Sequence, residues 1–285
     1  MSPNLSRRHL IAAALASGLV KPLRAQTVPF RLGLTPVFLS NDAEVLRYLQ
    51  SYLQDSLGRP VEFVQRRTYQ EVMGLLLGGS LDAAWICGYP YLQHEAALAV
   101  VGVPLWRGRP LYRSYLIVAP DSPAKGLVDL RGDIHAFSDP DSNSGYLVTT
   151  SDLAKLNERP DKFFGRTIFT YGHRNVVRAV AGGLTQSGSV DGYVWEALAR
   201  SEPALTRHTR VLEQSEWLGF PPIACQIARR DGGDMVAFAD ALLGMAESAT
   251  GQKALSLLQL DGFVPGDRAL FDGIAARMRL VAGRG

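Results

Sequence analysis

The chain has 285 residues, 47% hydrophobic and 20% charged, with 28 glycines, 16 prolines and two cysteines. This composition fits one large or two modest packed domains, and it excludes a disordered chain, a collagen-like repeat and a disulfide scaffold. The formal charge of +3 arises at the start of the chain, because residues 1–25 hold four basic residues and no acids, whereas the rest has 26 basic and 27 acidic residues. A nucleic-acid-binding protein normally keeps a basic surplus in its folded part, so we expect no nucleic-acid partner.

Residues 1–25 show the three-part pattern of an export signal. Arg7 and Arg8 precede an apolar stretch from Leu10 to Val20, and Ala25 supplies a small residue for cleavage. The paired arginines resemble a twin-arginine signal, and the apolar stretch is too short to cross a bilayer. We therefore predict a twin-arginine-type signal peptide over 1–25 and a mature protein in a bacterial periplasm.

Short strand-like runs alternate with helical runs through the first half of the remaining chain. The leucines at 46, 49, 53 and 57 have the spacing of one helix face, and the short apolar runs are typical of strands. The predicted strands are Phe30–Leu34, Val61–Gln65, Ala83–Cys87, Leu98–Val103 and Tyr112–Ala119, and the predicted helices are Ala43–Leu57 and Tyr69–Leu77.

A second cycle follows the turn at Pro120–Pro123 and precedes a helical tail from Met235. Its predicted strands are Ile134–Phe137, Thr167–Tyr171 and Val190–Val194, and its predicted helices are Gly145–Leu156, Asn175–Ala181 and Trp195–Ser201. This alternation predicts an α/β fold of mostly parallel sheets flanked by helices. We expect two hinged lobes, 26–115 with 215–285 and 116–214, with a ligand cleft between them, because open α/β sheets bind ligands beyond the carboxyl ends of their strands.

The most informative segment for function is Ser138–Tyr146, which follows a predicted strand and opens a predicted helix. Ser142, Asn143 and Ser144 place small donors where the first helical N–H groups are unpaired and the dipole is positive, which suits a phosphate-like anion. Simple N-capping is the other common use of such residues, and the sequence leaves both open. His173 follows another strand at a similar corner, so we expect it, partly charged near neutral pH, to donate to the same oxyanion.

A second group of candidates surrounds the end of the strand that begins at Ala83. Trp85 and Tyr89 offer aromatic walls of the kind found in ligand pockets, although core packing explains them equally well. Cys87 and Cys225 are the only thiols, and a disulfide, two buried thiols or soft ligands for a thiophilic species all remain open. Because no metal-ligand spacing, phosphate loop or nucleophile motif is present, we expect a binding protein without metal or cofactor, not an enzyme.

Together these residues resemble the phosphate/phosphite/phosphonate-binding proteins of ABC transporters, which are periplasmic receptors of the two-lobed type II fold. The most specific mark is the Asp-Pro-x-Ser-x-Ser-Gly stretch at 139–145. Supporting patches lie at 81–85, 114–118, 172–173, 180–181 and 190–191. Asn143 replaces the family's usual Thr. The resemblance implies an oxyanion site made of Ser142, Asn143, Ser144, His173 and Tyr69.

The departures from the family pattern concern the rest of the cleft. Cys87 stands where the family often has Gly, and Tyr193 and Trp195 follow a place where an aminophosphonate receptor offers acids, so we do not expect an aminoalkylphosphonate. We count Trp85, Cys87, Tyr89 and Trp195 as further candidates for the cleft wall. The sequence thus predicts a monomeric receptor that passes a small oxyanion to a membrane ABC permease. The alternative is a sensor that binds arsenite or a related thiophile through Cys87 and signals to a membrane histidine kinase.

Overall fold

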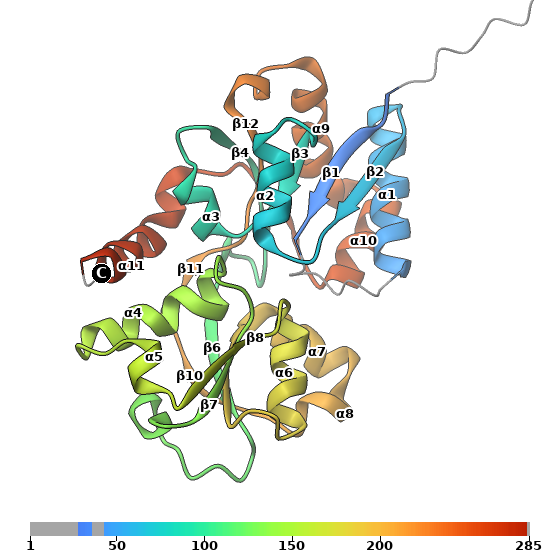
Figure 1. Cartoon of the computed structure of the whole chain (residues 1–285). Coiled ribbons are helices and arrows are strands. Elements are labelled where there is room, and N and C mark those ends of the chain that lie inside the picture. Colours follow the sequence, from blue (N-terminus) through green and yellow to red (C-terminus); the bar gives the residue numbers. More distant parts are fainter. Residues whose placement is uncertain (1–27, 36–42, 284–285) are drawn as a thin grey trace, which may run out of the picture.

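The structure is a computed structural model and describes residues 28–35 and 43–283. The predicted signal peptide over 1–25 lies outside this range. The strands form two large sheets, which we call the first and second lobes together with their helices, and Figure 1 shows them one above the other. A small two-stranded sheet lies between them. In the described parts of the chain, no helix is both long and apolar enough to cross a membrane.

The first lobe contains a six-stranded sheet whose order is β13-β4-β12-β3-β1-β2. The strand β1 pairs in parallel with β2 and β3, whereas β12 and β13 come from the end of the chain and pair antiparallel with their neighbours. The strands are β1 (Phe30–Leu34), β2 (Val61–Gln65), β3 (Ala83–Trp85), β4 (Leu98–Leu105), β12 (Ile223–Gln226) and β13 (Gly262–Val264).

The second lobe contains a five-stranded sheet whose order is β10-β6-β9-β7-β8. The strand β7 pairs in parallel with β8 and β9, and β6 pairs antiparallel with β9 and β10. The strands are β6 (Ser114–Val118), β7 (Ile134–Phe137), β8 (Arg166–Phe169), β9 (Ser187–Asp191) and β10 (Arg210–Gln214). Both sheets are therefore mixed, whereas mostly parallel sheets were expected. The difference arises because the strands next to the two crossings, β4, β6, β10 and β12, pair antiparallel with their neighbours.

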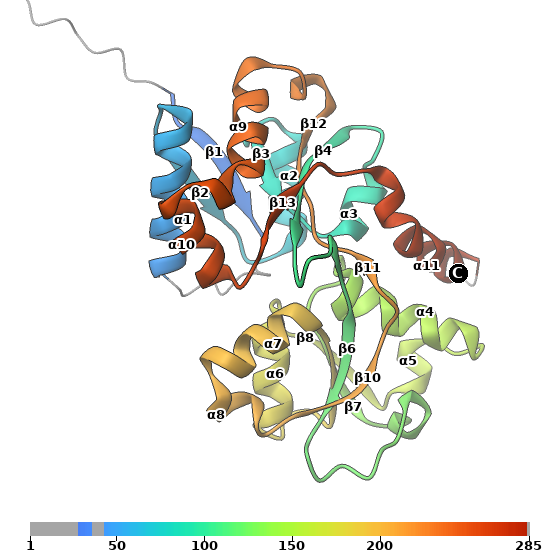
Figure 2. The same ribbon diagram turned by 180° about the vertical axis from the view of Figure 1, so that it is seen from behind.

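Helices cover both sheets, as the turned view in Figure 2 shows. Those of the first lobe are α1 (Ala43–Leu57), α2 (Tyr69–Leu77), α3 (Gly88–Gln93), α9 (Gly233–Leu243), α10 (Ala249–Leu258) and α11 (Asp272–Ala282). Those of the second lobe are α4 (Val148–Lys155), α5 (Pro160–Phe163), α6 (His173–Ala181), α7 (Gly192–Ser201) and α8 (Pro203–Thr206). The helix α1 buries Leu49 and Leu53 against the core, as their spacing predicts.

Two chain crossings and one helix connect the lobes. The crossings pair in the antiparallel ladder of β5 (Leu111–Tyr112) with β11 (Leu218–Gly219), and Ser114 and Ser215 hold them together through two hydrogen bonds. The terminal helix α11 packs against α4 of the second lobe (Figure 1). There Arg277, whose side chain is almost fully buried, contacts Asp152 of α4 and Glu216 of the second crossing.

Several elements match their predicted bounds, and the mismatches are local. The strand predicted at Val190–Val194 is wrong beyond Asp191, because Asp191 caps α7 by accepting from the Val194 N–H and the chain turns helical at Gly192. Similarly, α6 begins at His173, two residues before its predicted start, and α3 was not expected.

Candidate functional site

The segment around Ser142 opens a helix in the second lobe, as predicted. Residues Asn143–Leu147 form one π-helical turn that continues into α4, and the Ser142 hydroxyl caps it by accepting from the Gly145 N–H at 2.9 Å. Gly145 is required there, because a Cβ at this position would lie 1.8 Å from the Ser138 hydroxyl. The N–H of Ser144 has no acceptor among the described residues. One turn therefore contains both an N-capping serine, Ser142, and an N–H donor that is available to an anion, that of Ser144.

The first lobe meets this turn through Cys87, the residue before α3. The Asn143 N–H donates to the Cys87 sulfur at 3.2 Å. The Tyr89 N–H and the Tyr112 hydroxyl also bond to the thiol, but burial has the larger effect and raises the pKa of Cys87 to about 11. Cys87 and Cys225 are both free and buried, so the disulfide considered above does not form.

Tyr112, at the hinge, organises the same turn. Its hydroxyl accepts from the Asn143 side-chain N–H at 2.9 Å and also contacts the Ser144 side chain. Ser114, two residues on, donates to the Ser144 carbonyl at 2.6 Å. Burial, more than the neighbouring thiol and carboxyl groups, raises the pKa of Tyr112 well above its usual value, so the phenol stays protonated.

Tyr69 and His173 form a second contact between the lobes. The Tyr69 hydroxyl lies 3.2 Å from His173 Nε2, and the Asp191 N–H donates to His173 Nδ1 at 3.1 Å. Burial lowers the pKa of His173 to about 3, so the imidazole is neutral at physiological pH. The expectation of a partly charged His173 is therefore wrong, because a backbone amide occupies Nδ1 and the surrounding protein excludes water.

Two buried carboxyl groups complete this cluster. Asp139 accepts from the Asp141 N–H within its own turn and from the Tyr69 N–H of the first lobe, at 2.9 and 3.2 Å. Asp191 caps α7, and burial raises its pKa to about 7 despite the N–H donors of Tyr193 and Val194. Asp191 therefore keeps its proton to a higher pH than an exposed aspartic acid does.

The other residues predicted for the site are Trp85, Tyr89 and Trp195. Trp85 is buried in the first lobe, where its indole donates to the Pro221 carbonyl and its ring packs on Phe263. Tyr89 is half-buried beside Asp141 and Tyr146. Trp195 donates to the Thr209 hydroxyl at 3.0 Å and packs on Tyr115. The structure thus brings Tyr69, Cys87, Ser142, Asn143, Ser144 and His173 together, whereas the contacts of Trp85 and Trp195 are with other partners.

Sequence reasoning did not single out Tyr112, Ser114 or Asp191 as site residues. Ser114 and Asp191 both belonged to patches of family resemblance, and for Asp191 its position at the end of a buried strand was a further signal. Tyr112 and Ser114 lie two positions apart in the predicted strand Tyr112–Ala119. The sequence of this strand does not show that the chain crosses between the lobes there. Their role depends on the topology.

Two hollows lie outside the cluster, and neither lining includes one of its residues. An open groove is lined from both lobes by Thr35, Gln65, Arg66 and Arg67 on one side and by Thr170, Tyr171 and Asn175 on the other. Its lining also includes Glu71, so with the exposed Arg66 and Arg67 it carries a net charge of one positive unit, which favours the approach of anions. A small, mostly apolar cavity shares Leu34 and Gln65 with this groove and reaches Trp85, Tyr193 and Leu258.

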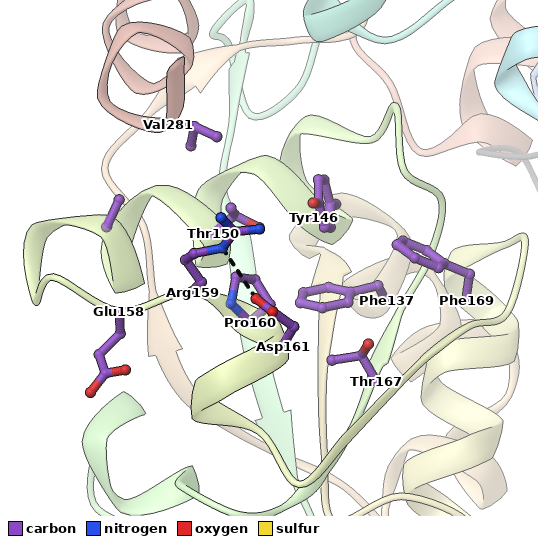
Figure 3. A pocket seen from close by; sticks show the side chains of 11 residues that line it. Phe137, Tyr146, Thr150, Glu158, Arg159, Pro160, Asp161, Thr167, Phe169 and Val281 are labelled. Carbon is purple, nitrogen blue, oxygen red and sulfur yellow. Dashed lines mark hydrogen bonds and ion pairs between the residues drawn. The ribbon is translucent and has the colours of Figure 1, made fainter. Parts of the chain in front are cut away.

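A separate pocket of about 460 Å³ opens on the second lobe and includes none of the predicted site residues (Figure 3). Phe137, Tyr146 and Phe169 form its aromatic wall, and the ion pair between Arg159 and Asp161 stands at its rim. Among the described residues, no group of three or more His, Cys, Asp or Glu side chains could hold a metal ion.

Comparison with known proteins gives a consistent result. The family model described as "ABC transporter, phosphonate, periplasmic substrate-binding protein" matches residues 32–271. The phosphate-import protein PhnD of Mycolicibacterium smegmatis is 28% identical over 195 residues, and the match spans 62% of this chain and only 61% of that protein.

Solved structures show the same fold. A binding protein component of an ABC phosphonate transporter from Pseudomonas aeruginosa superposes with a TM-score of 0.81 at 21% identity, over 90% of this chain and 89% of the other. PhnD1 from Prochlorococcus marinus, solved with methylphosphonate, superposes with a TM-score of 0.78 at 17% identity, over 89% of this chain and 98% of the other. With the family model matching most of its length, the chain belongs to the periplasmic substrate-binding proteins of phosphonate ABC transporters.

Proposed function

We propose that this chain captures a small tetrahedral oxyanion of the phosphonate class between its lobes and delivers it to a membrane ABC permease. The observation that carries the proposal is the pair of interlobe contacts, Tyr69 with His173 and Cys87 with Asn143. Asn143 begins the turn before α4, where the next N–H, that of Ser144, has no acceptor among the described residues. Both contacts join residues of different lobes. Lobe closure therefore assembles the donors that an oxyanion needs.

The proposed lobes are 26–115 with 215–285 and 116–214. The two crossings at β5 and β11 support this division, because the chain passes from one sheet to the other at these points alone among the described residues. Closure about this hinge is expected to make the molecule more compact when the ligand binds. Small-angle scattering with and without methylphosphonate measures that change.

The substituent of the ligand is expected to be small and apolar. The small cavity that includes the predicted site residue Trp85 is lined mainly by aliphatic and aromatic side chains, among them Tyr193 and Leu258. The Tyr193 hydroxyl is already committed to the Leu258 carbonyl at 2.6 Å. An ammonium group would lose its hydration there without gaining a strong partner.

Calorimetry tests the ligand class directly. We expect at least one of methylphosphonate, phosphite and phosphate to bind in the micromolar range or tighter. Ser142→Ala should weaken that binding, because it removes the cap of the π-helical turn. Ser201→Ala is the matched control, since Ser201 bonds only within α7, to the Ala197 carbonyl. Failure of every anion to bind would overturn the proposal.

The thiophile-sensing alternative has less support. A thiophile binds the thiolate, and burial raises the pKa of Cys87 to about 11, which keeps the thiol protonated at neutral pH. The family match also points to transport.

Export through a twin-arginine signal is the second part of the proposal, and the family's periplasmic location supports it. Arg7 and Arg8 would be the recognised pair. Replacing both with lysine should leave the full-length chain in the cytoplasmic fraction, while unchanged export of the double variant would contradict this route. Stimulation of a reconstituted permease complex by the loaded protein tests delivery.

A further inference from the structure

The hydrogen bonds around His173 run in a fixed direction. A backbone N–H can only donate, so the bond from Asp191 makes Nδ1 of His173 an acceptor. In the neutral imidazole the proton then resides on Nε2, and Nε2–H donates to the Tyr69 oxygen. The Tyr69 proton has no acceptor among the described residues, although Tyr69 is almost fully buried. The Tyr69 O–H is thus available as a hydrogen-bond donor.

The side chain of Asn143, in the same cluster, offers a hydrogen-bond acceptor where Tyr69 offers a donor. Its N–H group donates to the Tyr112 hydroxyl, whereas its carbonyl oxygen Oδ1 is buried and has no hydrogen-bond partner among residues 28–35 and 43–283. Buried polar atoms in proteins are nearly always paired, so an orphan acceptor at a binding site indicates a donor on the ligand. The N–H of Ser144, the next residue, has no acceptor in the part of the chain that the structure describes. The turn therefore offers one acceptor beside one donor.

We propose that Asn143 determines specificity by accepting a hydrogen bond from a P–OH group, so that the site takes the singly protonated phosphonate and rejects sulfonates. This inference rests on the proposed function. Tyr69 and the Ser144 N–H donate to the ionised oxygens of the ligand, and Asn143 Oδ1 accepts from the protonated one. A sulfonate has the same tetrahedral shape but no O–H near neutral pH, and its third oxygen would face the carbonyl oxygen as a second acceptor.

The charged and titratable groups around Asn143 are consistent with a monoanion. Cys87 and Tyr112 stay protonated, and Asp139 and Asp191 carry negative charge when ionised. His173 is neutral. A dianion would therefore meet no counter-charge within the cluster.

The test compares two anions of equal shape and charge. At about pH 6, methylphosphonate is largely a monoanion with one O–H, and methanesulfonate is a monoanion with none. Calorimetry on the unmodified protein should show a preference of at least about 100-fold for methylphosphonate, because sites built to bond a ligand O–H reject analogues that lack it. Binding of methanesulfonate within about threefold would overturn the inference and leave the proposed function standing. Binding of neither anion would instead refute the proposed function.

Asn143→Thr provides a second measurement. A hydroxyl can donate or accept, so the variant should bind methanesulfonate more tightly and reduce the preference to below about tenfold. Gln252→Thr is the control, because Gln252 is an exposed amide side chain of α10 that bonds to the Ala246 carbonyl, and the preference of this variant should equal that of the unmodified protein. An unchanged preference in Asn143→Thr would also overturn the inference.

Discussion

The Asn143 N–H donates to the Cys87 sulfur across 3.2 Å, and this bond joins the helix start of the second lobe to the first lobe. The thiol is a weak acceptor compared with a phosphonate oxygen. A ligand oxygen that took over this N–H would therefore gain a stronger bond than the one it displaces. The contact favours closure without competing strongly with the ligand.

Thiol labelling should report lobe opening. Cys87 is buried and burial raises its pKa to about 11, so we expect iodoacetamide to modify it far more slowly in the native protein than after unfolding. Methylphosphonate should slow the reaction further, by about tenfold or more, because only the open form exposes the thiol. In the Cys87→Ser variant, any iodoacetamide label that mass spectrometry detects belongs to Cys225, so the two thiols can be told apart. Equal rates in native and unfolded protein would contradict the burial of Cys87.

Tyr69→Phe should weaken phosphonate binding by about 10- to 100-fold. The change removes a donor to the ligand and leaves His173 Nε2–H without its acceptor, a loss of about 1–3 kcal/mol in the closed form. Tyr52→Phe is a suitable control, because Tyr52 is a buried tyrosine that donates to the Ala241 carbonyl at 2.5 Å within the first lobe. Calorimetry should show normal affinity for Tyr52→Phe, and equal losses in both variants would exclude a direct role for Tyr69.

The free energy of unfolding should decrease in acid because of two buried histidines. Burial lowers the pKa of His135 and of His173 to about 3, below the unfolded value near 6.5, so the unfolded chain binds more protons between these values. The contribution of the two neutral histidines to the free energy of unfolding is fully present above about pH 6.5. It is lost as pH falls toward 3, by up to about 1.4 kcal/mol per pH unit for each histidine. Urea unfolding of His135→Gln from about pH 4 to 7 should show a shallower slope, and an unchanged slope would argue against this account.

Asp191 should act in the opposite direction. Burial raises the pKa of Asp191 in the folded protein to about 7. The stabilising contribution of this group to the free energy of unfolding is therefore fully present below the unfolded pKa near 3.8 and is lost as pH rises through 7. Asparagine keeps the N-cap bond to Val194 and cannot ionise. Relative to the unmodified protein, Asp191→Asn should therefore gain stability as pH rises from 4 to 8, and bind methylphosphonate more tightly above pH 7. A stability difference that did not vary with pH would refute a raised pKa.

Arg277 should matter for the joint between lobes. Its guanidinium is nearly buried and contacts Glu216, Asp152 and the Ser151 hydroxyl. Arg277→Met should lower the free energy of unfolding by about 1–3 kcal/mol, because it removes the hydrogen bonds of the buried guanidinium to Glu216 and Ser151, whereas Asp152 keeps its ion pair with Lys155. Arg268→Met is the control, since Arg268 forms only exposed ion pairs and should cost less than about 1 kcal/mol. Similar losses in the two variants, measured by denaturant unfolding, would contradict this role.

Local sequence patterns determined most elements of this protein. The spacing of apolar residues in α1 and the short apolar runs of β1, β2 and β7 predicted the bounds of these elements. A buried helix face or a buried strand requires apolar residues at nearby positions, so a local pattern reveals it. The serines and glycine of 142–145 likewise indicated a helix start, since unpaired N–H groups need local donors and acceptors. The strand predicted beyond Asp191 failed because strand and helix were equally consistent with Tyr193 and Val194, and the cap decided for the helix.

Only the tertiary structure decided which of these residues share a site and in which protonation state. Tyr69 and His173 are 104 residues apart, and Cys87 and Asn143 are 56 apart, so no local pattern relates them. The neutral state of His173 likewise depends on exclusion of water by both lobes and on one amide of Asp191. Long-range packing sets these properties because desolvation and hydrogen-bond direction depend on neighbours in space, not on neighbours in the chain.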